Sequence, residues 1–139
     1  MRPYLLLTPG PLTTTGTVKQ AMMSDWCTWD EDYNLGIVEV IRKELVEIAT
    51  SAPDEYTAVL MQGSGSFCVE ATLGSVVRPE DKLLVAANGA YGKRMGIISE
   101  YYHIDCHVMR FEEIEPVNAN KIDTYLNEHQ EVTHVSVVH

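Results

Sequence analysis

Short β-prone runs alternate with segments of helical periodicity along most of the chain, and this alternation constrains the fold more than any other feature. Strands are predicted at about 57–61, 83–87, 104–109 and 132–138. Helices are predicted at about 17–23, 33–50 and 120–128, and after two glycine-rich turns at 62–66 and 88–92. Strands joined through helices form right-handed crossovers, so the sequence predicts an α/β fold, a mostly parallel sheet with helices on both faces.

The acidic composition disfavours a polyanionic partner. The 139 residues include 10 Lys and Arg against 20 Asp and Glu, which gives a formal net charge of −10. No basic stretch with interleaved aromatic residues is present, so we expect no nucleic-acid partner. Hydrophobic residues make up 45% and charged residues 22%, a composition typical of one folded soluble domain.

The cysteines and the N-terminal leucines bear on the cellular location. Cys27, Cys68 and Cys106 are widely spaced and include no Cys-x-x-Cys pair, which argues against a disulfide framework or a zinc knuckle. The run Leu5–Leu7 is followed by Pro9-Gly10-Pro11, too early for a signal-peptide core or a spanning helix. We therefore expect a cytoplasmic protein with reduced thiols and no membrane partner.

Composition also suggests how the chain is organised. Residues 1–15 are rich in Pro, Gly and Thr and predict an N-terminal arm that is suited to lining a site. Residues 16–139 show no linker or repeat and predict one α/β body. The last run, 135–139, ends in or just after a strand with no helix behind it, so we expect this body to be incomplete.

The strongest local signal is the turn Gln62-Gly63-Ser64-Gly65-Ser66, between a predicted strand and a predicted helix. Glycines let the backbone approach an anion, and the helix N-terminus and the serine hydroxyls supply donors, so a phosphate group is the natural ligand. The alternative is a tight turn in which Ser64 or Ser66 only caps the helix. A Walker A loop is excluded because no Gly-Lys-Ser/Thr follows, and Cys68 and Asn88 weaken a dinucleotide fingerprint.

A second turn, Asn88-Gly89-Ala90-Tyr91-Gly92, follows the next predicted strand. Carboxyl ends of parallel strands meet at one edge of a sheet, so Tyr91 would lie near the first turn and could stack on a flat ligand held there. A phosphate cradle beside an aromatic ring predicts a phosphorylated aromatic cofactor. An ordinary turn with a half-buried tyrosine is the alternative.

Two further groups of residues have open interpretations. His103, Asp105 and His107 alternate along one predicted strand and would share a face, as metal ligands do, but histidines on strands are usually structural and no fourth ligand is evident. We therefore expect no metal. Trp26 and Trp29 would indicate a subunit interface if exposed and a core if buried.

Taken together, these segments resemble the 2-aminoethylphosphonate–pyruvate aminotransferases, a class V family of fold-type-I pyridoxal phosphate enzymes. The resemblance runs the length of the chain. It rests on these segments: residues 4–13, Cys27-Thr28-Trp29-Asp30 with Asp32-Tyr33-Asn34, residues 62–66 with Val69-Glu70-Ala71, and residues 88–92.

The resemblance implies that Ser64, Gly65 and Ser66 hold the phosphate of pyridoxal 5'-phosphate and that Tyr91 stacks on its pyridine ring. It implies that the arm around Gly10 borders the substrate pocket. The implied reaction transfers the amino group of 2-aminoethylphosphonate to pyruvate, giving phosphonoacetaldehyde and alanine in phosphonate degradation. The implied assembly is a homodimer, and residues 16–139 become an incomplete cofactor-binding large domain.

The family's Schiff-base lysine and the acid that contacts the pyridine nitrogen match no residue of this sequence. None of Lys19, Lys43, Lys82, Lys93 and Lys121 matches the catalytic position. No catalytic residue is therefore assigned, and the 139 residues alone are expected to be inactive. A non-catalytic domain that at most binds pyridoxal phosphate or phosphate is the main alternative, and a nicotinamide-dependent dehydrogenase domain is a weaker one.

Overall fold

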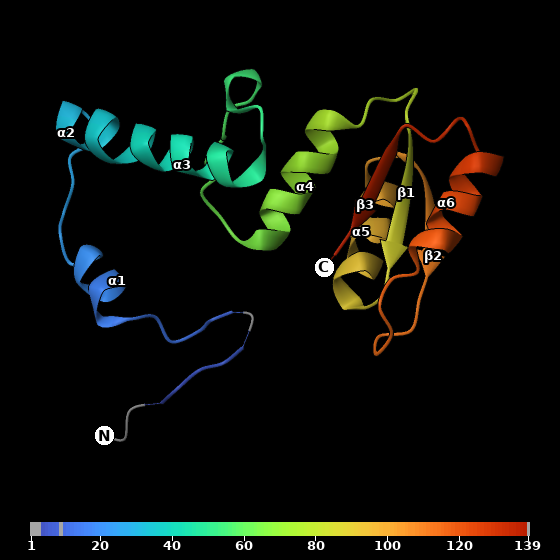
Figure 1. Cartoon of the computed structure of the whole chain (residues 1–139), viewed down its shortest axis with the longest axis horizontal. Coiled ribbons are helices and arrows are strands. Elements are labelled where there is room, and N and C mark those ends of the chain that lie inside the picture. Colours follow the sequence, from blue (N-terminus) through green and yellow to red (C-terminus); the bar gives the residue numbers. More distant parts are fainter. Residues whose placement is uncertain (1–3, 9, 139) are drawn as a thin grey trace. The chain divides into compact units, whose positions relative to one another are not determined.

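The structure is a computed structural model that describes residues 4–8 and 10–138. It separates into two compact units, residues 1–60 and residues 61–139, which we call unit 1 and unit 2 (Figure 1). Each unit is described by itself.

Unit 1 is helical. Its elements are α1 (Gly16–Ala21), α2 (Glu31–Tyr33), a π-helical turn η1 (Asn34–Val38), α3 (Glu39–Ala49) and a short 3₁₀ turn η2 (Pro53–Glu55). The helices predicted at 17–23 and 33–50 are thus confirmed, although a π turn interrupts the second one. Val46 is the one buried residue among those that the structure describes in unit 1.

The strand predicted at 57–61 is wrong. Within the described residues, this segment pairs with no strand, and a β-strand exists only through pairing. Its polar groups bind Arg42 of α3 instead. The Arg42 guanidinium donates from Nε to the Ala58 carbonyl oxygen at 2.9 Å and from Nη2 to Thr57 Oγ1 at 2.7 Å.

Unit 2 contains a three-stranded parallel sheet in the order β2-β1-β3. The strands are β1 (Lys82–Ala87), β2 (Asp105–Arg110) and β3 (His134–Val137), which confirms three of the predicted strands. Three helices, α4 (Gly65–Val76), α5 (Ala90–Tyr101) and α6 (Ala119–Glu128), complete the unit. The predicted α/β architecture is confirmed.

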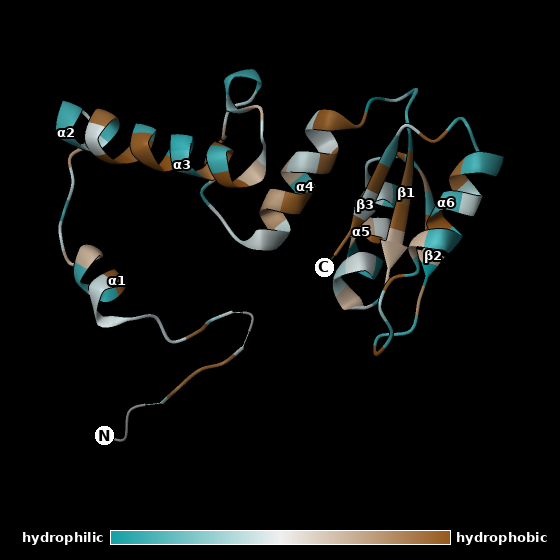
Figure 2. Ribbon diagram, in the orientation of Figure 1, coloured by the Kyte–Doolittle hydropathy of each residue, from teal (hydrophilic) through white to brown (hydrophobic). Residues whose placement is uncertain are grey.

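Helices lie on both faces of this sheet (Figures 1 and 2). Cys106 and Val108 of β2 face α5, whereas His107 stacks on Tyr125 of α6 with 4.6 Å between ring centroids. Because successive side chains of a strand point to opposite faces, α5 and α6 cover opposite faces. Leu83 to Ala87 of the central strand are at most 1% exposed, as expected for a strand buried on both faces.

A buried carboxylate anchors the start of β1. Asp81 is 3% exposed and accepts hydrogen bonds from Arg78 at its Nε (3.0 Å), its Nη2 (3.2 Å) and its backbone N–H (2.9 Å). The Arg78 side chain, followed by its backbone N–H, lowers the pKa of Asp81 to about 2.

This shift predicts how stability depends on pH. An unfolded Asp titrates at roughly 3.9, so the Asp81 contribution is complete above about pH 4 and is lost as pH falls through about 2. We expect Asp81→Asn to lower the urea midpoint of unit 2 by a constant amount from pH 7 to 5, and the difference from the unchanged chain to shrink below pH 4.

The matched control is Glu80→Gln, because Glu80 contacts the same arginine at 3.3 Å while remaining exposed. Surface pairs contribute little, so this variant should track the unchanged chain at every pH. A gap between Asp81→Asn and the unchanged chain that stays constant down to pH 2 would contradict the prediction.

Candidate functional site

The phosphate cradle expected at 62–66 is the start of α4. Ser64 is the N-cap, and its hydroxyl oxygen accepts a hydrogen bond from the backbone N–H of Phe67 at 3.2 Å. The first turn of a helix leaves its N–H groups without intrahelical partners, so those of Gly65 and Ser66 stay available. Ser64 therefore caps the helix, and the next two N–H groups stay available, while a phosphate at this turn stays a prediction.

Gly63 lets the chain turn tightly at this point. A Cβ atom on Gly63 would lie 2.6 Å from Cδ1 of Phe67, closer than real Cβ contacts permit. The phenyl ring of Phe67 therefore packs directly on the glycine backbone. This close approach depends on glycine at position 63, just before the donors of Gly65 and Ser66.

The second turn brings Tyr91 to the start of α5. Gly92 is buried, and a Cβ atom there would lie 2.6 Å from Cα of Ala87, so glycine lets α5 begin directly against the end of β1. Tyr91 is 57% exposed. The ring is therefore accessible, as stacking on a ligand requires.

Arg94 of α5 connects the two turns. Its Nη1 donates a hydrogen bond to Ser66 Oγ at 2.6 Å, and its guanidinium carbon lies over the Tyr91 ring, 5.5 Å from the centroid. Our sequence interpretation missed this residue. The available signal was its position three residues after Tyr91, which puts both side chains on one side of the helix.

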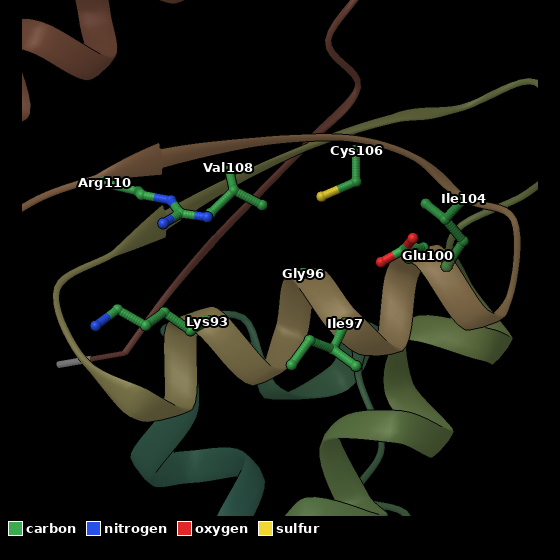
Figure 3. Close-up of a pocket in the computed structure, with 8 residues that line it drawn as sticks. All are labelled: Lys93, Gly96, Ile97, Glu100, Ile104, Cys106, Val108 and Arg110. Carbon is green, nitrogen blue, oxygen red and sulfur yellow. The ribbon is translucent and has the colours of Figure 1, made fainter.

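Lys93, the neighbour of Arg94, has a different environment. Its Nζ lies 3.3 Å from Oε1 of Glu113, and it borders a cavity of about 490 Å³ between α5 and β2 (Figure 3). Arg110 lies at the same end of the cavity as Lys93, while Cys106 lies farther along it. Burial raises the pKa of the Cys106 thiol. This cavity is on the β2 side of α5, and Ser66 does not line it.

The arm that contains Gly10 folds back on itself. The Thr13 N–H donates to the Leu6 carbonyl oxygen at 2.9 Å, the Leu6 N–H donates to Thr13 Oγ1 at 2.7 Å, and Leu7 forms an antiparallel bridge with Leu12. Gly10 lies in the turn between these segments, while Pro9 lies outside the described residues. A role for Gly10 in substrate binding stays a prediction.

The structure also shows where the candidate histidines and tryptophans lie. His103 lies in a turn with a φ of 57°, and His107 is stacked on Tyr125. Over residues 4–8 and 10–138, no three metal-ligating side chains cluster. Trp26 and Trp29 are 51% and 91% exposed, and their place in a subunit interface stays a prediction. No helix in the described part of the chain is long and apolar enough to cross a membrane.

Comparison with known proteins relates this geometry to a family. No family model matches the chain. All 139 residues align at 62% identity with a 2-aminoethylphosphonate–pyruvate transaminase of Bacteroides fragilis strain YCH46, and cover 38% of that protein. A transaminase of the same name from Bacillus thuringiensis strain Al Hakam is 54% identical over 136 residues, 98% of the chain and 37% of the relative. The chain is thus similar, over nearly its whole length, to a part of each of these two transaminases.

Solved aminotransferases share the fold of the chain. An alanine–glyoxylate aminotransferase from Nostoc superposes on the whole chain with a TM-score of 0.80 at 25% identity, and the chain covers 36% of it. A pyridoxamine–pyruvate aminotransferase from Mesorhizobium loti gives a TM-score of 0.78 at 25% identity, with 35% of that protein covered. The chain spans little more than a third of each of these four proteins.

Proposed function

We propose that these 139 residues are the cofactor-phosphate and ring-binding part of a pyridoxal phosphate-dependent aminotransferase. The whole enzyme would transfer the amino group of 2-aminoethylphosphonate to pyruvate, giving phosphonoacetaldehyde and alanine. The observation that carries the proposal is the junction of α4 and α5, where Arg94 joins the helix start at Ser66 to the exposed ring of Tyr91. The identity of 62% over the whole chain supports the choice of substrates.

The donors at this junction fit a phosphate monoester. The N–H groups of Gly65 and Ser66 and the Ser66 hydroxyl converge on one helix N-terminus, where the helix dipole favours an anion. Ser64 would add its hydroxyl proton, because its oxygen alone is used by the cap. Tyr91 offers an aromatic surface for a flat heterocycle. A fixed phosphate beside a stacking ring would hold such a cofactor in one orientation.

The cofactor, when bound, supplies the electron sink that stabilises negative charge on the carbon bearing the amino group. The residues of this chain would bind and orient it. The Nζ atoms of Lys82 and Lys93 are engaged by carboxylates, Lys82 with Glu131 at 3.1 Å and Lys93 with Glu113 at 3.3 Å.

Several features of the whole protein belong to the same proposal. Residues 1–15 would form an arm whose turn at Gly10 borders the substrate pocket, and residues 16–139 would belong to the large domain. Exposed Trp26 and Trp29 would lie in the interface of a homodimer. The enzyme would act in the cytoplasm, in phosphonate degradation.

A chimera tests the proposal. These 139 residues would replace the matching segment of the Bacteroides fragilis transaminase, with which they align over their full length. We expect the chimera to form alanine from pyruvate and 2-aminoethylphosphonate. In it, Ser66→Ala should raise the Kd for pyridoxal phosphate about 10- to 150-fold, because a hydrogen bond to a charged group contributes about 1.5–3 kcal/mol.

Ser75→Ala is the matched control. Ser75 also lies on α4, and its hydroxyl donates to the Ala71 carbonyl oxygen at 2.6 Å, away from the helix start. This variant should bind the cofactor as the unchanged chimera does. Equal Kd values for Ser66→Ala and Ser75→Ala would contradict the proposed cradle. A chimera that binds the cofactor but forms alanine only with other amino donors would contradict the proposed substrate.

A further inference from the structure

Arg94 has two contacts that point toward the candidate phosphate site. Its guanidinium reaches from α5 to Ser66 Oγ on α4 at 2.6 Å, across 28 residues of sequence, and also lies over the Tyr91 ring. The Ser66 hydroxyl and the Tyr91 ring are the two groups that, in the proposed function, bind the phosphate and the ring of the cofactor. The residue itself lies at the surface of unit 2 and packs into no core.

The direction of the Arg94–Ser66 hydrogen bond is fixed by chemistry. A guanidinium has donors and no acceptor, so Arg94 donates and the Ser66 oxygen accepts. The single hydroxyl proton of Ser66 is therefore not used by Arg94. Because the Ser66 oxygen accepts from Arg94 on one side, the Ser66 hydroxyl proton points away from Arg94. The N–H groups of Gly65 and Ser66 mark where an anion would lie, and that anion would accept the hydroxyl proton.

The charge of Arg94 is also free for a ligand. In the described part of the chain, no carboxylate forms an ion pair with Arg94. Glu70, one turn beyond Ser66 on α4, accepts a hydrogen bond from the Tyr102 hydroxyl at 2.7 Å instead. A phosphate group at the start of α4 would thus meet an uncompensated positive charge.

We propose that Arg94 is the positioning residue of the phosphate site. It orients the Ser66 hydroxyl for donation to a phosphate oxygen and adds a positive charge to the cradle. This inference rests on the proposed function, since it assigns Arg94 a task at the same site. The task concerns a phosphate monoester, so it predicts discrimination between the cofactor and its dephosphorylated form.

The chimera described above allows a direct test with two ligands, pyridoxal phosphate and pyridoxal. We expect Arg94→Met to raise the Kd for pyridoxal phosphate at least tenfold and to change the Kd for pyridoxal less than twofold. Arg94→Lys, which keeps the charge and a donor, should recover part of the loss. Lys93→Met removes the neighbouring cation, which faces Glu113, and should leave both Kd values unchanged.

A double-mutant cycle separates positioning from a charge effect alone. If Arg94 acts through Ser66, Arg94→Met should weaken cofactor binding less in the Ser66→Ala background than in the unchanged chimera. Full additivity, or an equal loss for pyridoxal and pyridoxal phosphate, would overturn the inference. So would equal behaviour of Arg94→Met and Lys93→Met.

The outcomes also distinguish this inference from the proposed function. A chimera that binds pyridoxal phosphate but forms no alanine would refute the proposed activity, while the Kd comparison would still decide the role of Arg94. A folded chimera that binds neither pyridoxal phosphate nor inorganic phosphate would overturn both.

Discussion

Gly92→Ala is expected to destabilise unit 2 strongly. The added methyl group would lie 2.6 Å from Cα and 2.8 Å from Cβ of Ala87, and the first of these is a backbone atom that no side-chain rotation can move. Overpacking typically costs about 1–3 kcal/mol, and we expect the upper end or more here. A unit of this size is stabilised by only about 4–12 kcal/mol, so the variant should show a greatly lowered urea midpoint by far-UV circular dichroism.

Gly74→Ala is the matched control for this prediction. Gly74 lies within α4, and a Cβ atom there meets nothing within 4 Å. Alanine is the better helix former by about 0.8–1.0 kcal/mol, so this variant should equal or exceed the unchanged chain in stability. The prediction fails if Gly92→Ala and Gly74→Ala unfold at the same urea concentration.

In the monomeric 139-residue chain, we expect amide hydrogens to exchange much faster in unit 1 than in the sheet of unit 2. The strand β1 is buried on both sides, whereas in unit 1 Val46 is the one buried residue among those described. Isolated helices of fewer than about 12–15 residues are marginal in water, and α3 has 11 residues. We expect the amides of Leu84, Val85 and Ala86 to exchange at least 100-fold more slowly than those of α3.

The exposed apolar side chains of unit 1 give this experiment a second readout. Leu35, Ile48 and Val59 are 61%, 83% and 74% exposed, and such surface promotes association. Protection of α3 should therefore rise with protein concentration while that of β1 stays constant. Strong protection of α3 at a concentration where the chain is monomeric would refute the prediction.

Local features of the site could be predicted from the sequence because their physics is local. The Gly-Ser-Gly-Ser turn predicts a helix start, and Ser64 caps that helix three residues before Phe67. The strands at 82–87 and 105–110 follow from short apolar runs between turns. In each case the interacting residues lie close together in the sequence.

The errors and omissions concern contacts between distant residues. A β-prone run at 57–61 is a strand only if another strand lies beside it. Here the Ala58 carbonyl oxygen accepts a hydrogen bond from the side chain of Arg42, 16 residues earlier, instead. The contact of Arg94 with Ser66 depends on how α5 packs against α4, which no local pattern specifies. The stacking of His107 on Tyr125 likewise depends on where α6 lies against the sheet.

The Arg94–Ser66 contact also sets an order of events during synthesis. Ser66 leaves the ribosome 28 residues before Arg94, which at about 5–20 residues per second corresponds to a delay of about 1.4–5.6 seconds. During that interval α4 has its donors but lacks the guanidinium that orients the Ser66 hydroxyl. A nascent chain therefore completes the pairing of these two side chains only after the first turn of α5 has been translated and has docked on β1.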